Sequence, residues 1–146
     1  MDTDRNKTPY QGQCLCGTIK YEIDEIESQM AHCHCSMCRK FHGAAFSTYG
    51  EAKTECFRWL EGLDSLKTYL ADNGTKRKFC ERCGSSLIFV PSADGGKFVE
   101  FSLGTLDSEI DIKPDAHVFS CSAASWYEIN DSLPKFTEGR DSKYIK

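Results

Sequence analysis

Hydrophobic and polar positions of this 146-residue chain alternate over short runs and do not recur at a helical spacing. The clearest run is Thr18–Ile23, in which apolar and polar side chains alternate. Alternation of this kind is typical of a β-strand with one buried face, because successive side chains point to opposite sides of a sheet. The chain is therefore expected to consist mainly of short strands.

Further strands are expected where a short apolar run ends at a turn sequence. These runs cover residues 30–33, 45–49, 56–60, 66–70, 77–79, 86–90, 98–103 and 117–119, followed by an extended segment at 132–136. The turn sequences are Gly50, Glu61-Gly62, Asp72-Asn73-Gly74, Asp94-Gly95-Gly96 and Lys113-Pro114-Asp115. One helical turn is expected at Ser36–His42, with Ser36 as its N-cap. We predict a mainly β fold, a sandwich of short antiparallel strands with little helix.

The length suits a single domain, which we place at residues 9–146, after a polar and disordered tail at residues 1–8. No apolar stretch is long enough to span a membrane, so no membrane partner is expected. The first residues lack the apolar core of a secretory signal, which indicates a cytoplasmic protein. The sequence does not set the oligomeric state.

The net charge of -4 and the pI near 5.6 argue against nucleic acid as a partner. Binding to phosphates requires a basic face, and the only basic run is Lys76-Arg77-Lys78. Aromatic residues make up 12% of the chain, including nine phenylalanines, which suits a compact β core.

The chemistry of the chain is concentrated in its nine cysteines, seven of which form three clusters. Cys14, Cys16, Cys80 and Cys83 are two pairs, called here the knuckle cysteines, and Cys33, Cys35 and Cys38 are called the cysteine trio. In a reducing cytosol such spacings favour metal binding over disulfides, and an odd number of cysteines fits a disulfide framework poorly. Zinc is the expected metal, because it binds thiolates in a tetrahedral shell.

The knuckle cysteines provide four thiolates for one closed, structural zinc site. Such a site would join the N-terminal region to the middle of the chain and close a long loop. A redox role for Cys80 and Cys83 is the alternative, which the lack of a surrounding βαβ pattern disfavours. Ordinary buried thiols are a further alternative.

The cysteine trio provides only three ligands for a second zinc ion. His32, His34 or His42 could complete a closed shell; otherwise water or a substrate thiol takes the fourth position. Three thiolates make zinc a weak Lewis acid, yet a thiol that binds there loses its proton. An open site of this kind suits chemistry on sulfur better than the activation of water.

The order of these clusters resembles the glutathione-dependent formaldehyde-activating enzyme family, also called the Gfa or centromere protein V family. The resembling motifs are Cys14-Leu-Cys16-Gly17, Cys33-His-Cys35-Ser-Met-Cys38, Thr75–Phe79, Cys80-Glu-Arg-Cys83-Gly84, Ser85–Leu87, His117 and Ser125-Trp126-Tyr127. The resemblance extends from about residue 12 to residue 136.

This resemblance implies an Mss4-like fold with two zinc ions per chain. The knuckle cysteines would hold the structural zinc and the cysteine trio the catalytic zinc. The implied activity is that of a carbon–sulfur lyase that joins glutathione, as co-substrate, to formaldehyde and forms S-hydroxymethylglutathione. Bringing a bound thiol next to the aldehyde would replace a bimolecular encounter. The alternative function is a non-catalytic zinc module, either a thiol or glutathione carrier or a protein-binding domain.

Individual side chains near the trio allow two interpretations each. His34, with His32 on the same side of an extended strand, is either a catalytic proton shuttle or a supporting residue. Arg39 either binds a substrate carboxylate or faces solvent. Trp126, far along the chain from the trio, is expected in the core and not as a platform for a ligand, since large aromatic side chains are highly buried on average.

Two cysteines remain outside the clusters. Cys56 is expected to be a buried apolar thiol, because free cysteines are commonly buried. Cys121 is flanked by serines and is expected to be exposed and oxidisable.

Overall fold

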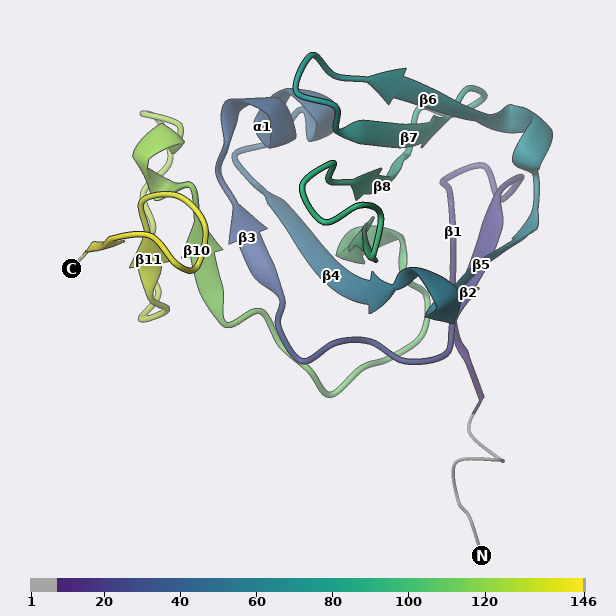
Figure 1. Cartoon of the computed structure of the whole chain (residues 1–146), viewed down its shortest axis with the longest axis horizontal. Coiled ribbons are helices and arrows are strands. Elements are labelled where there is room, and N and C mark those ends of the chain that lie inside the picture. The colour runs from purple at the N-terminus through teal and green to yellow at the C-terminus, as the bar shows by residue number, and fades with distance from the viewer. Residues whose placement is uncertain (1–7, 146) are drawn as a thin grey trace, which may run out of the picture. The chain divides into compact units, whose positions relative to one another are not determined.

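Short β-strands predominate in the computed structural model, which describes residues 8–145 and contains one α-helix within them (Figure 1). The predicted mainly β fold is confirmed. The predicted tail at residues 1–8 lies outside the described residues, apart from Thr8. The chain falls into two compact units: unit 1 comprises residues 1–27 and 51–110, and unit 2 comprises residues 28–50 and 111–146.

Unit 1 is built from seven antiparallel strands. They are β1 (Tyr10–Gln13), β2 (Lys20–Ile23), β5 (Phe57–Glu61), β6 (Leu66–Leu70), β7 (Lys76–Cys80), β8 (Ser86–Val90) and β9 (Phe98–Ser102). Strands β1, β2 and β5 form a three-stranded sheet, and β6 to β9 pair in sequence order. Short 3-10 turns follow at Thr54–Cys56, Leu63–Ser65 and Leu103–Thr105.

The core of unit 1 gathers on one face of β2, as the alternating pattern predicts. Ile19, Tyr21 and Ile23 have no exposed surface. The Tyr21 ring stacks on Phe57 at 5.1 Å, and its hydroxyl lies 2.7 Å from Thr105 Oγ1. Burial raises the pKa of the Tyr21 phenol, so this side chain stays neutral inside the core.

A tight turn at Gly62 connects β5 to the next 3-10 turn. Gly62 has a φ of +84°, and a Cβ at this position would lie 2.2 Å from the Thr18 carbonyl oxygen. Both features require glycine, because other residues strain at positive φ and any side chain would meet backbone here.

Unit 2 contains the helix and the remaining strands. They are β3 (Ala31–Cys33), α1 (Ser36–His42), β4 (Ser47–Lys53), β10 (Ala116–Val118), β11 (Lys135–Phe136) and β12 (Tyr144–Ile145), and the 3-10 turn Ser120–Ser122 follows β10. The strand order is β12-β11-β10-β3-β4, and the last residues of β4 belong to unit 1. Strand β10 runs parallel to both β3 and β11, so the strands are not all antiparallel as expected (Figure 1).

Two predicted strand bounds in unit 2 are wrong for different reasons. Gly50 is buried within β4, which continues through it to Lys53 instead of turning there. Strand β10 ends at Val118 because Phe119 adopts a left-handed conformation with a φ of 56°. Glycine usually marks a turn, so Gly50 misleads the sequence prediction, and no local sequence signal marks the left-handed conformation of Phe119.

The expected burial of Trp126 is also wrong, because 72% of the residue is exposed. Trp126 lies on the loop after the last 3-10 turn, outside every strand. Cys121 is exposed as expected, whereas Cys56 is only half-buried.

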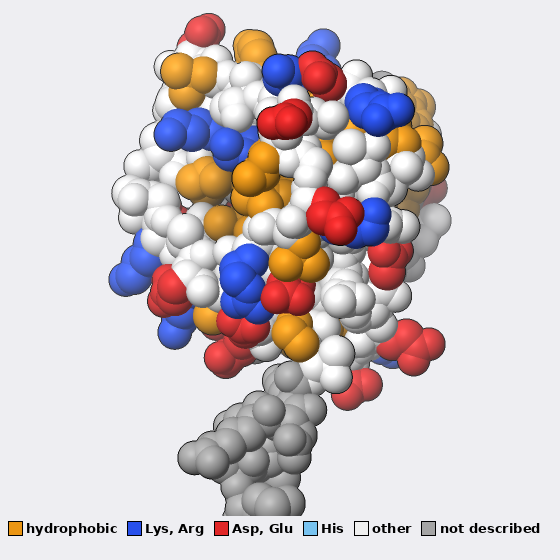
Figure 2. Space-filling view, turned by 90° about the vertical axis from the view of Figure 1, so that its right-hand side faces the viewer, with side chains coloured by type: hydrophobic (Ala, Val, Ile, Leu, Met, Phe, Trp, Pro, Cys, Tyr) orange, Lys and Arg blue, Asp and Glu red, His pale blue; other side chains and the backbone are white. Residues whose placement is uncertain are grey.

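Charged side chains of both signs are interspersed on the face shown in Figure 2, and hydrophobic side chains form small, separate groups there. This face therefore carries no field of a single sign. Throughout residues 8–145, no helix has the length and apolar character needed to cross a membrane.

Candidate metal centres

The four knuckle cysteines come together in unit 1. Their sulfur atoms all lie within 4.8 Å of one another, although the two pairs come from the two separate sequence segments of this unit. Cys14 and Cys80 are buried, Cys83 is half-buried and Cys16 is exposed. Four sulfur ligands at this spacing fit a tetrahedral zinc ion, in which each Zn–S bond measures about 2.3 Å.

Two glycine turns shape this first centre. Gly17 follows the Cys14–Cys16 pair with a φ of 78°, and Gly84 follows the other pair with a φ of 79°. The Gly17 N–H donates to the Cys14 carbonyl, and the Gly84 N–H donates to the Cys80 carbonyl at 2.8 Å. These turns reverse the chain so that both thiols of a pair face the same point.

Neighbouring hydroxyl groups favour ionisation of two of these thiols. The Thr18 hydroxyl lies 3.3 Å from Cys16 Sγ and lowers the pKa of that thiol. Burial opposes ionisation of Cys83, but hydrogen bonds from Ser85 lower its pKa to about 5. Ser85 Oγ accepts the Leu15 N–H at 2.8 Å, so its own hydrogen is free for Cys83 Sγ, 3.3 Å away. These two positions are thus suited to thiolate ligands, whereas burial raises the pKa of Cys80 to about 11.

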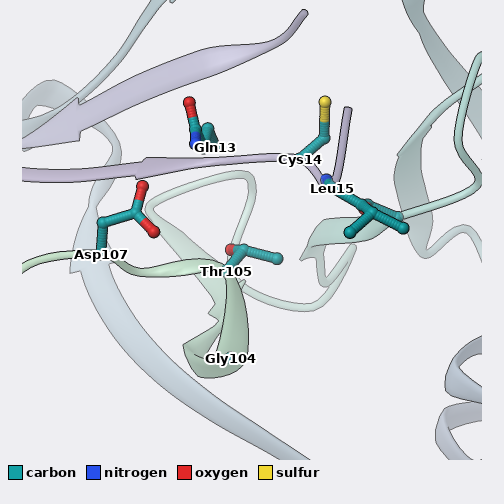
Figure 3. A pocket seen from close by; sticks show the side chains of 7 residues that line it. Gln13, Cys14, Leu15, Gly104, Thr105 and Asp107 are labelled. Atoms are coloured by element: carbon teal, nitrogen blue, oxygen red, sulfur yellow. The ribbon is translucent and has the colours of Figure 1, made fainter. Parts of the chain in front are cut away.

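A cavity of about 340 Å³ lies beside the first centre in unit 1. Its lining consists of Gln13, Cys14, Leu15, Ser85, Gly104, Thr105 and Asp107 (Figure 3). Figure 3 shows that the Cys14 sulfur points away from Thr105 and Asp107.

The cysteine trio forms a second centre in unit 2, where β3 passes into α1. Its three sulfur atoms lie within 4.8 Å of one another. Cys33 ends β3, and Cys35 is the N-cap of α1, because its sulfur accepts the Cys38 N–H at 3.2 Å. The predicted N-cap, Ser36, is instead the first helical residue. The helix start and the ligand cluster are therefore the same local structure.

The trio has the electrostatics of a cation site. Hydrogen bonds from the Cys33 thiol to Cys35 and Cys38, followed by burial, raise the pKa of Cys33 well above its usual range. Three thiolates cannot crowd together without a positive charge among them. A divalent cation would remove this penalty, so the donor set fits zinc.

No fourth His, Cys, Asp or Glu ligand joins the trio anywhere in the described part of the chain. Two of the histidines considered from the sequence have other partners. His32 Nδ1 lies 2.7 Å from Thr48 Oγ1, and His42 Nε2 lies 2.6 Å from the Tyr49 hydroxyl. The candidate ligand set among the described residues is therefore three sulfurs.

The third histidine, His34, belongs to a hydrogen-bonded chain. Its Nε2 lies 2.8 Å from His117 Nδ1, and His117 Nε2 lies 2.9 Å from Asp131 Oδ2. Burial lowers the pKa of His34 to about 4, so its ring is neutral near pH 7. The rings of His32 and His34 both contact His117, at 4.9 and 5.0 Å, so they share one side of β3.

Arg39 follows the trio directly in α1. It is half-buried, and its Nε atom is buried without a hydrogen-bond partner among the described residues. Lys40, the next residue, is exposed. Aromatic rings lie nearby, since Phe46 is 5.1 Å from His34 and 5.4 Å from Tyr127. A cationic side chain thus follows the trio in sequence, and an aromatic ring packs against His34, which lies between two of its cysteines.

Sequence reasoning missed Asp131 entirely and noted His117 only as part of a motif. His34 and His117 are 83 residues apart and meet through the parallel pairing of β10 with β3. No spacing rule reports such a contact. The one available signal was the motif that contains His117.

Comparison with known proteins gives three findings. A family model described as glutathione-dependent formaldehyde-activating enzyme matches residues 9–122. An uncharacterised lyase of Schizosaccharomyces pombe is 27% identical over 120 residues, which cover 76% of this chain and 85% of the relative. A crystal structure of a Rhodobacter sphaeroides protein matches with a TM-score of 0.59 at 22% identity, over 69% of this chain and 91% of that protein. At this identity the last match shows a shared fold alone.

Proposed function

The chain belongs to the glutathione-dependent formaldehyde-activating enzyme family, and on this basis we propose that it is a zinc-dependent carbon–sulfur lyase. The proposed reaction joins a thiol, glutathione or a related molecule, to a small aldehyde such as formaldehyde. The observation that carries the proposal is the three-sulfur centre, which no fourth ligand from the described residues completes. A three-ligand shell is typical of catalytic zinc sites.

In this reaction the thiol sulfur forms a bond to the aldehyde carbon and the C=O π bond breaks. The thiol proton ends on the former carbonyl oxygen, so no oxidant or reductant is required. Cys33, Cys35 and Cys38 would hold the zinc, which when bound favours the thiolate form of a thiol. The knuckle cysteines would hold a structural zinc ion. We place the protein in the cytoplasm, where thiols are kept reduced.

Two further side chains have proposed roles in this reaction. Arg39 is suited to a carboxylate of the thiol substrate, because its guanidinium offers several donors and its Nε has no partner among the described residues. His34 is proposed as the catalytic side chain that accepts a hydrogen bond from the reacting groups, as the buried histidine nearest the trio in sequence.

The first test is the zinc content per chain after purification under reducing conditions, with and without excess glutathione. We expect two zinc ions per chain, with the second perturbed or released by glutathione. In parallel, NMR with ¹³C-formaldehyde should show faster formation of the hydroxymethyl thioether with the protein than without it. Two zinc ions that do not respond to glutathione, together with no rate increase, would contradict the proposal and favour a non-catalytic zinc module.

A further inference from the structure

Asp131, His117 and His34 form a continuous hydrogen-bonded chain across unit 2, called here the carboxylate–histidine chain. His117 Nε2 lies 3.0 and 2.9 Å from the two carboxylate oxygens of Asp131. His117 Nδ1 lies 2.8 Å from His34 Nε2. Asp131 lies beyond residues 9–122, so the family match assigns it no role.

The backbone holds each member of this chain in place. The His34 N–H donates to the Val118 carbonyl at 3.0 Å, and the Leu133 N–H donates to Asp131 Oδ1 at 3.1 Å. His117 has only 1% of its surface exposed, and its own N–H donates to the Pro134 carbonyl at 2.8 Å. The three side chains are therefore preorganised in one geometry.

The positions of the hydrogens follow from the donors and acceptors. Asp131 is ionised near neutral pH, because its hydrogen bond with His117 lowers the pKa of its carboxyl. Carboxylate oxygens only accept, so His117 Nε2 must carry a hydrogen. In a neutral His117 the other ring nitrogen, Nδ1, is then bare. His34 Nε2 must therefore carry the hydrogen between the rings, which leaves His34 Nδ1 bare.

The opposite arrangement would place the shared hydrogen on His117. A neutral His34 would then carry its hydrogen on Nδ1. That nitrogen is buried and has no hydrogen-bond partner among the described residues. A buried N–H without an acceptor is rarer in proteins than an acceptor that lacks a donor, so the first arrangement is favoured.

We propose that Asp131 is a positioning residue that acts through His117 to fix His34 in its Nε2–H tautomer and to leave His34 Nδ1 as a bare hydrogen-bond acceptor. The ligand class that this acceptor would take is a molecule with an S–H or O–H donor, such as a thiol or its hydroxymethyl adduct. A buried nitrogen without a partner points to such a donor. The catalytic consequence rests on the proposed function, whereas the tautomer assignment does not.

The direct test is ¹⁵N NMR of the imidazole rings in the zinc-loaded protein. The chain has four histidines, and His34→Gln and His117→Gln spectra would assign the two that matter. We expect His34 Nδ1 to show the shift of an unprotonated nitrogen and His34 Nε2 that of an N–H. A hydrogen on His34 Nδ1 in the wild type would overturn the proposal.

Asp131→Asn tests whether Asp131 sets the tautomers of His117 and His34. The new amide would keep its oxygen on the Leu133 N–H and turn its NH₂ toward His117. His117 Nε2 would then become an acceptor and the hydrogens of both rings would reverse, so that His34 Nδ1 gains a hydrogen. Asp131→Glu should retain the wild-type pattern. The matched control is Asp141→Asn, an exposed carboxyl elsewhere in unit 2, which should leave the spectrum unchanged.

Kinetics provide a separate readout. Asp131→Asn should lower kcat by roughly tenfold or more at unchanged zinc content, with a smaller effect on KM for the thiol, while Asp141→Asn stays at the wild-type rate. Unchanged tautomers in Asp131→Asn would overturn the proposal even if the wild type is active. An inactive wild type would overturn the proposed function instead, and the spectra would still decide the tautomer.

Discussion

At the scale of single residues, Cys35 combines two tasks. Its sulfur accepts the Cys38 N–H and so starts α1, and the same sulfur belongs to the three-sulfur group of the second centre. Cysteine is not among the usual N-cap residues. Its use here is explained by the position of the ligand cluster, because one sulfur atom both caps the helix and faces the other two thiols.

Cys35→Ser separates these tasks. A serine oxygen is a better N-cap acceptor than sulfur, so α1 and the fold should persist. The shorter, harder hydroxyl is a poor zinc ligand, so the zinc content should fall from two ions per chain to one and activity should be lost. Elemental analysis, circular dichroism and the formaldehyde assay measure these effects.

The matched control for that variant is Cys121→Ser, since Cys121 is exposed and belongs to neither sulfur group. It should keep both zinc ions and full activity. Full activity in Cys35→Ser with one zinc would show that the trio is not the catalytic centre.

Ser85 is the residue that favours ionisation of Cys83 against the effect of burial. Ser85→Ala should raise the pKa of Cys83. Protons compete with zinc for the thiolate as the pH falls, so the variant should release zinc from the first centre at a higher pH than the wild type. A chromophoric chelator followed across a pH series measures this shift. Ser122→Ala is the control. If the wild type, Ser85→Ala and Ser122→Ala all release zinc over the same pH range, the hydrogen bond between Ser85 and Cys83 does not stabilise zinc binding.

The metal ligand candidates were predictable from the sequence because each cluster is local. Cys33, Cys35 and Cys38 need only a short turn to meet, and the chelating spacing reports this directly. The carboxylate–histidine chain was not predictable, because it depends on the register of β10 against β3. Pairing of distant parallel strands leaves no periodic trace in a single sequence.

At the scale of elements, the strands best predicted are those bounded by clear turn sequences. β6 and β8 have their predicted bounds, Leu66–Leu70 and Ser86–Val90. β1 was missed, because Tyr10–Gln13 is mostly polar and contains no alternation. It forms because β2, with its buried face, offers an edge for pairing. Tertiary context thus overrides local preference for the weakest strands.

A substitution at Gly62 measures how much the turn after β5 contributes to the free energy of unfolding. Gly62→Ala should lower the free energy of unfolding by about 3 kcal/mol, because the positive φ strains an alanine and its Cβ would meet the Thr18 carbonyl. Gly95→Ala is the matched control. Gly95 also has a positive φ, of +69°, but nothing lies within 4 Å of its Cβ position.

Gly95→Ala should therefore cost only about 1 kcal/mol, the strain of the backbone alone. Urea denaturation of the three proteins gives both values. An equal decrease in the free energy of unfolding of the two variants would mean that the turn at Gly62 relaxes. The close approach to Thr18 would then make no contribution to the effect of Gly62→Ala.

At the scale of the whole molecule, the two centres differ in the length of chain that they join. Cys16 and Cys80 lie 64 residues apart in sequence with sulfur atoms 3.8 Å apart. The trio lies within one short segment. A cross-link that closes a long loop removes more entropy from the unfolded chain, so the first centre should contribute most of the metal-dependent stability.

Cys80→Ser should therefore lower Tm far more than Cys35→Ser does, and a strong chelator should reproduce the larger effect. Differential scanning fluorimetry at one fixed zinc concentration compares the variants. Equal shifts would contradict the assignment of the first centre as structural. The readout is independent of activity, so it holds whether or not the trio is catalytic.

The parallel pairing of β3 with β10 also sets an order of events during synthesis. His34 and His117 are 83 residues apart, and a ribosome adds roughly 5–20 residues per second. The trio therefore emerges several seconds before the strand that completes its side of the sheet. During that interval the short segment that carries the trio already contains all three sulfurs of the second centre. Zinc can thus reach the trio before the fold closes around it, and ribosome-bound chains stalled after α1 has left the exit tunnel, but before β10 is made, should already retain the metal.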